Sequence, residues 1–136
     1  MPSSFDFDPK NRILRIRLSG NVDDESLKEA YATGFKLAIR VKPQSGLFDF
    51  SGVKSLDVSP QTIRELAKNT PIMSNPSLRR VIIAPSSHMF GIARSFELQS
   101  EDSRPNLHVV RTEREALAIL AVQHPRFEPV ALEEFE

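Results

Sequence analysis

The hydroxyl and carboxyl side chains that could do chemistry gather in one stretch, residues 46–66. An apolar run, Leu47–Phe50, predicts a buried strand, and a polar loop follows it. Ser59 and Pro60 then predict a helix start, because serine caps a first-turn amide and proline fits the first helical position. A helix N-terminus attracts anions through its free amides and its dipole. We therefore expect an interaction or anion site here, with these candidate residues: Asp49, Ser51, Ser55, Asp57, Ser59 and Thr62.

Two kinds of chemistry could use this stretch. Ser59 could accept a phosphate group, which would sit on the free amides of the helix. The alternative, which we favour, is that Ser59 is a plain N-cap. Asp49 and Asp57 could hold a metal ion or work as an acid/base pair. We favour the alternative that each stabilises a turn where an element begins or ends.

A second set of candidates follows the next apolar strand. Ser86, Ser87 and His88 could belong to a hydrolase, but neighbours at a helix start rarely point at each other, and no nucleophile-elbow motif is present. A serine that caps a second helix explains the same residues. Arg94, like Arg79 and Arg80, could bind an acidic partner, and its alternative is a solvated charge on a buried stem. We expect no catalytic residues.

Composition excludes several classes of function. The 136 residues form one domain, and their net charge of zero argues against a general nucleic-acid binder. With no cysteine, thiolate chemistry and cysteine-based zinc sites are excluded, and a cytoplasmic location fits. The three histidines are scattered and do not have the spacing of zinc ligands, and the five glycines are too dispersed to form a phosphate-binding loop. We therefore expect neither a metal nor a cofactor. No apolar run is long enough to cross a bilayer, so we expect no membrane insertion.

The elements that must position these residues alternate between strand and helix. We expect an α/β fold with a mixed sheet, in which an N-terminal antiparallel hairpin joins parallel βαβ units. A turn is expected at 19–21, and the last helix is expected to end at His124-Pro125. We divide the chain into a domain, 1–122, and a C-terminal tail, 123–136, which Phe127, Val130, Leu132 and Phe135 could dock on the body. The expected strands are 5–8, 13–18, 47–50, 81–84 and 107–110, and the expected helices are 24–40, 60–69, 87–100 and 113–123.

This pattern resembles the STAS domain family, which includes bacterial anti-sigma-factor antagonists and the tails of sulphate transporters. The resemblance runs from about Phe5 to Leu120 and rests on four segments. They are Leu18–Asp23, Leu47–Asp57, Ala93–Leu98 and Val109–Leu117. The resemblance implies a regulatory, protein-binding module that is not an enzyme.

One position departs from the family pattern. In regulatory members a phosphorylatable serine or threonine directly follows the loop aspartate, but here Val58 follows Asp57. We therefore expect a protein-interaction module without the usual phosphoserine switch, acting through the surface around residues 51–62. A homodimer is an open possibility. The alternative is a small-ligand or lipid-binding domain, and an apolar pocket of about 300 Å³ or more between helices and sheet would favour it.

Overall fold

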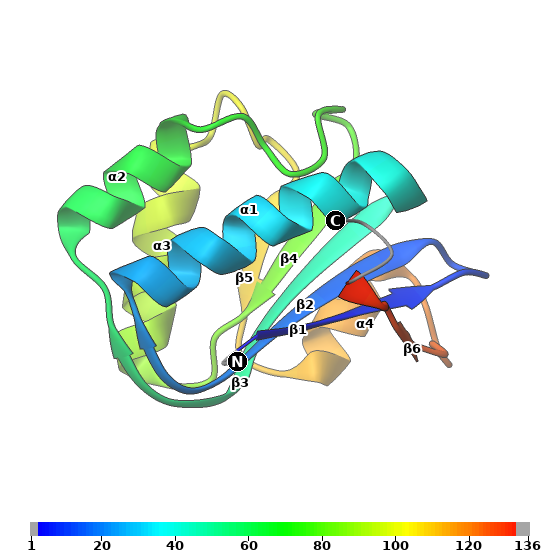
Figure 1. The fold of residues 1–136 in the computed structure, drawn as a ribbon, viewed down its shortest axis with the longest axis horizontal. Coiled ribbons are helices and arrows are strands. Elements are labelled where there is room, and N and C mark those ends of the chain that lie inside the picture. Colours follow the sequence, from blue (N-terminus) through cyan, green and yellow to red (C-terminus); the bar gives the residue numbers. More distant parts are fainter. Residues whose placement is uncertain (1–2, 133–136) are drawn as a thin grey trace.

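The computed structural model describes residues 3–132, which form one mixed sheet flanked by helices (Figure 1). The order of the strands across the sheet is β5-β4-β3-β2-β1-β6. Strands β2 to β5 run parallel, whereas β1 and β6 are antiparallel to their neighbours. This confirms the expected α/β class. The elements are β1 (Ser3–Asp8), β2 (Ile13–Asp23), α1 (Asp24–Val41), β3 (Ser45–Asp57), α2 (Pro60–Lys68), β4 (Arg79–Ile83), α3 (Ser87–Gln99), β5 (Leu107–Val110), α4 (Glu113–Leu120) and β6 (Glu128–Pro129).

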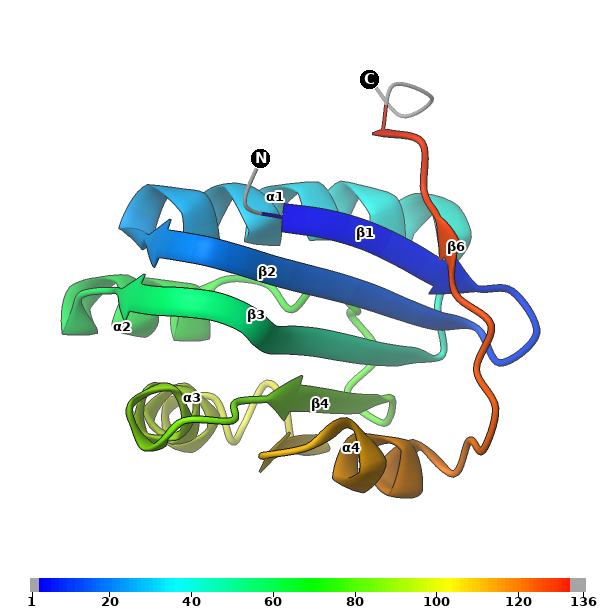
Figure 2. The same cartoon turned by 90° about the horizontal axis from the view of Figure 1, so that it is seen from below.

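Two apolar clusters lie on opposite faces of the sheet. Helices α1, α2 and α3 cover one face, which we call the front, and α4 covers part of the other, the back (Figure 2). The uniformly apolar strand β4 serves both clusters, because Ile82 faces the front while Val81 and Ile83 face the back. A continuous apolar run is typical of such a strand, which is buried on both faces. Helix α1 approaches the sheet closely at Gly34, where an added Cβ would lie 2.6 Å from Ile16.

Strands β2 and β3 extend further than the sequence pattern predicts. The expected turn at 19–21 and the expected polar loop after Phe50 are both wrong, because these segments pair as parallel strands up to Asp23 and Asp57. Their polar side chains point to solvent, and Val53 and Leu56 anchor the extension in the core. The pairing shifts register beside Gly20, whose φ of 70° suits glycine.

The serine caps predicted for α2 and α3 are confirmed, whereas one helix end differs from its prediction. Asp23, Ser59, Ser86 and Thr112 each accept a hydrogen bond from a first-turn amide. Helix α4, however, ends at Leu120 and not at His124-Pro125. Its last carbonyls are satisfied by the amides that follow, with Ala121 in the left-handed region at φ 59°. The backbone therefore leaves the helix before the proline is reached.

The segment after α4 returns across the back of the sheet and adds strand β6 next to β1. Phe127 packs on the back cluster, and Val130 and Leu132 pack on the front cluster. Phe135 lies outside the described residues. Residues 123–132 thus lie against the same sheet as the rest of the chain, and the division at residue 122 stays a prediction.

The open part of the back face carries charge. Both Arg15 and Arg17 pair with the buried Asp6, at 3.0 and 3.1 Å. Arg15 also stacks on Phe127, with its guanidinium carbon 3.9 Å from the ring centroid. Over residues 3–132, no helix is long and apolar enough to cross a membrane.

Candidate functional site

The carboxyl ends of β2 and β3 meet the N-termini of α1 and α2 at one edge of the molecule (Figure 1). Asp23 and Asp57, the last residues of the two strands, are register partners. Both are exposed, as are Ser51 and Ser55 further back along β3. We call this surface, formed by residues 51–62 together with 21–24, the β2–β3 edge. Of the expected candidates, Ser51, Ser55 and Asp57 are therefore on the surface, and a strand carries them where a loop was expected.

Ser59 caps α2 as the sequence predicts. Its Oγ accepts a hydrogen bond from the amide of Thr62 at 3.2 Å and lies 3.1 Å from the Thr62 hydroxyl. Thr62 itself is buried. The hydroxyl of Ser59 is thus engaged in holding the helix start.

Asp24 is a further residue of this edge, and nothing in the sequence pattern points to its contact with Ser59. Its Oδ1 accepts a hydrogen bond from the amide of Ser59 at 2.8 Å. That hydrogen bond lowers the pKa of Asp24, so the carboxylate is charged at neutral pH. A carboxylate of the chain already lies at the start of α2. A phosphate on Ser59 would therefore meet a like charge.

The remaining candidates on β3 have separate local roles. Asp49 is buried, and its Oδ1 accepts a hydrogen bond from the Ser51 amide at 2.8 Å. Ser55 donates a hydrogen bond to Asn21 at 2.8 Å. Asp49 and Asp57 lie eight residues apart on one strand, which at the usual rise separates them by about 26 Å. The hypothesis that they form an acid/base pair or share a metal is therefore wrong.

The second set of candidates lies around the start of α3. Ser86 caps that helix by accepting a hydrogen bond from Met89, and Ser87 is exposed. His88 donates from Nε2 to the carbonyl of Leu56 at 2.9 Å, because a carbonyl can only accept. This hydrogen bond ties α3 to the end of β3. The bonded nitrogen is thus turned toward the backbone and away from a serine hydroxyl.

The arginines divide into exposed and buried ones. Arg94 is exposed and pairs with Glu97 on its own helix, and Arg79 donates to the carbonyl of Ile119 at 2.9 Å. Arg80 was expected to be solvated, and that expectation is wrong. Its side chain is buried and donates to the carbonyls of Leu78, Met73 and Asn75. The residues before β4 curl around the guanidinium and supply these acceptors.

A second buried arginine, Arg104, was not singled out because it lies in a stretch that reads as a polar loop. It donates to the carbonyls of Leu66, Ala67 and Asn69 at the C-terminus of α2, at 3.3, 3.1 and 3.2 Å. It also donates to the hydroxyl of Tyr31 at 2.7 Å and stacks on Phe96. The cation thus satisfies the end of one helix and joins it to α1.

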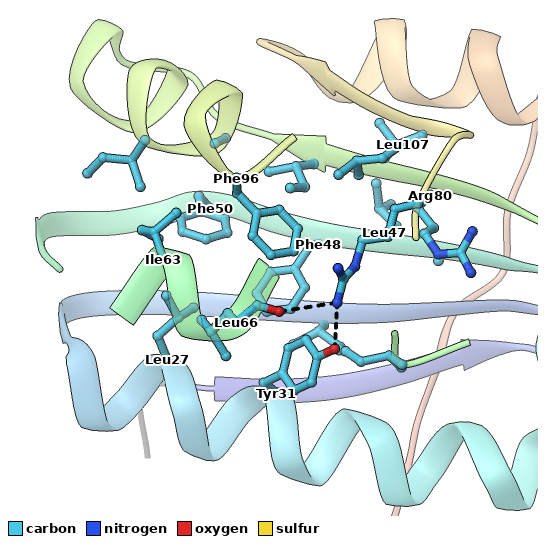
Figure 3. Close-up of a pocket in the computed structure, with 18 of the residues that line it drawn as sticks. Leu27, Tyr31, Leu47, Phe48, Phe50, Ile63, Leu66, Arg80, Phe96 and Leu107 are labelled. Atoms are coloured by element: carbon cyan, nitrogen blue, oxygen red, sulfur yellow. Dashed lines mark hydrogen bonds between the residues drawn. The ribbon is translucent and has the colours of Figure 1, made fainter. Parts of the chain in front are cut away.

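An apolar cavity of about 120 Å³ lies between the three front helices and the sheet (Figure 3). Arg80 and Arg104 belong to its wall. The cavity is smaller than the roughly 300 Å³ expected of a pocket for a drug-sized ligand. A hollow of about 300 Å³ lies elsewhere, between the C-terminal half of α1 and the 70–78 segment. That hollow does not lie between the helices and the sheet. It is therefore not the apolar pocket that would favour a small-ligand or lipid-binding domain.

No protein-family model matches the sequence, and no curated protein matches it. Its structure is similar to that of the anti-sigma factor antagonist SpoIIAA in its unphosphorylated form, with a TM-score of 0.53. The match covers 82% of this chain and 91% of that one, at 14% sequence identity. The chain therefore has a STAS-like fold. No group of histidine, aspartate or glutamate side chains in residues 3–132 is arranged to hold a metal ion.

Proposed function

We propose that this protein is a non-enzymatic regulatory module that binds a protein partner through the β2–β3 edge. Its fold is that of an anti-sigma factor antagonist, and this likeness carries the proposal. The edge also presents exposed polar residues, Ser51, Ser55 and Asp57, on a strand anchored in the core. A rigid strand with outward polar groups suits recognition of a partner surface. The proposed location is the cytoplasm.

The module works without a phosphoserine switch in this proposal. Val58, at the position where regulatory members of the STAS family carry their phosphoacceptor, is partly buried against the front cluster. Ser59, one residue later, is occupied as a cap and faces Asp24. Binding would then be regulated by the supply of the partner and not by modification of this edge.

A charge reversal on the edge tests this function. Asp57→Arg replaces an exposed carboxylate on the proposed surface, and Asp102→Arg makes the same change in the exposed turn after α3. Both variants and the wild type would be used to capture proteins from the native host, with quantitative mass spectrometry of the captured proteins. We expect a partner that the wild type and Asp102→Arg retain and that Asp57→Arg loses. A partner retained equally by all three would contradict the proposed surface.

A further inference from the structure

We propose that the cavity between the front helices and the sheet is a binding site for a small, uncharged, apolar molecule, about the size of one aromatic ring. This site lies in the interior, where the buried Leu56 is part of its wall, and it goes beyond the proposed protein-binding function of the β2–β3 edge. The proposal rests on the size of the cavity, on the apolar chemistry of most of its wall and on the hydrogen bonds that the polar groups at one end already make.

The size of the cavity is unusual for a natural core. Protein interiors are close-packed and hold few voids larger than a water molecule. A cavity of about 120 Å³ is close to the roughly 150 Å³ of an engineered apolar cavity that stays dry and binds benzene. An empty space of this size costs stability, because the atoms around it lose contacts that a ligand would restore.

The wall is built from aliphatic and aromatic side chains that come from separate elements (Figure 3). Leu27 comes from α1, Ile63 and Leu66 from α2, Phe96 from α3, and Phe48 and Phe50 from β3. Water needs free polar partners, and the polar groups of this wall, on Tyr31, Arg80 and Arg104, already bond to the protein, so an apolar molecule is the occupant that fits. Met89, Ile92 and Phe96 line the cavity from α3 and are half-buried, so this helix adjoins both the cavity and the surface.

The polar end of the cavity explains why the ligand is uncharged. Arg104 donates to three carbonyls and to Tyr31, and the Tyr31 hydroxyl donates to the carbonyl of Thr70. Within residues 3–132, no buried side-chain nitrogen or oxygen lacks a hydrogen-bond partner. A carboxylate would therefore have to displace existing hydrogen bonds, and an ammonium would meet the two guanidinium groups of Arg80 and Arg104.

Three probes of one shape test the proposal: toluene, benzoate and benzylammonium. Each would be titrated into the full chain while the methyl groups of methionine, isoleucine and leucine are followed by NMR. We expect saturable binding of toluene, with shifts at Met89 and Ile92, and at least tenfold weaker binding of the two ions. Absence of saturable toluene binding would overturn the site. Benzoate binding as tight as toluene, or tighter, would overturn the claim that the ligand is uncharged.

Matched variants place the ligand in this cavity. Ala93→Leu adds bulk to the cavity wall from α3, and Ala118→Leu makes the same change on the exposed side of α4. Toluene affinity should fall at least tenfold in the first and stay unchanged in the second. If Ala93→Leu does not fold, Leu56→Ala provides a second test. This variant enlarges the cavity, which should then bind naphthalene. Unchanged toluene binding in Ala93→Leu, or no naphthalene binding in Leu56→Ala, would overturn the placement.

Discussion

Asp24 and Ser59 show how a single pair of residues changes the meaning of a site. The sequence pattern predicts that Ser59 caps a helix, and the structure confirms it. The pattern does not show that a carboxylate 35 residues earlier reaches the same amide group. That contact depends on the parallel pairing of β2 with β3, which brings the starts of α1 and α2 together. A phosphate-sensitive site at this helix start is therefore disfavoured.

The charge of Asp24 makes a prediction about Ser59 variants. Ser59→Ala should lose about 1 kcal/mol of unfolding free energy, because the cap is removed. Ser59→Asn and Ser59→Asp both restore a cap, but the aspartate faces Asp24 and should be less stable than the asparagine. In an Asp24→Asn background, which keeps the acceptor and removes the charge, the gap should disappear. Urea unfolding of these variants measures the difference in unfolding free energy between Ser59→Asp and Ser59→Asn. If that difference persists in the Asp24→Asn background, Asp24 is not its cause.

Tyr31 gives a second prediction at this scale. Burial raises its pKa above the ordinary value of 10.0, although Arg104 acts in the opposite direction. Because the folded-state pKa is raised, the stabilisation is present below pH 10 and is lost as pH rises through the folded-state pKa. It is the only tyrosine, and the chain has no tryptophan, so the phenolate absorbance reports it alone. We expect the pKa of Tyr31 to be higher in the folded protein than in the urea-unfolded protein. Tyr31→Phe should lose less stability than the wild type on going above pH 10.

At the scale of elements, sequence patterns within one segment predict helices and strands well, but they predict poorly which segments pair with each other. The apolar run at 81–84 and the serine caps of α2 and α3 are local features, and they are confirmed. The extension of β3 is not local, since its polar residues become a strand only because β2 runs beside them. The same holds for Arg104, whose acceptors lie 35 to 38 residues away in sequence. A buried cation with backbone partners leaves no pattern in the sequence.

Asp8 joins two elements and is fully buried. It accepts hydrogen bonds from Lys10 and Asn11 in the turn between β1 and β2, and from the amide of Arg126 before β6. Burial alone would raise the pKa of Asp8, but these hydrogen bonds outweigh it and lower the pKa. Its contribution to stability is therefore present at neutral pH and lost as pH falls through that lowered value.

We predict that Asp8→Ala destabilises the protein by about 2–3 kcal/mol, because several amides lose their acceptor. Amide exchange should rise both in the turn and around residue 126. Hydrogen exchange followed by mass spectrometry checks this result. A rise confined to the turn would show that Asp8 does not hold the segment before β6.

At the scale of the whole molecule, one sheet supports two separate cores, and β4 lies between them. Ile82→Asp should therefore unfold the domain, because an unpaired buried carboxylate costs several kcal/mol. Ile39→Asp is the matched control, since that side chain is 61% exposed. Thermal melting separates the two. A cooperative transition at the wild-type midpoint in Ile82→Asp would contradict the central place of β4.

The central claim is that a protein partner binds the β2–β3 edge, and the direct measurement is the footprint of that partner. Amide hydrogen exchange of this protein would be compared with and without the partner recovered from the native host. We predict slower exchange in residues 51–62 and 21–24, with little change on the open back face around Arg15 and Arg17. Slower exchange confined to the back face, or to the hollow between α1 and residues 70–78, would contradict the claim.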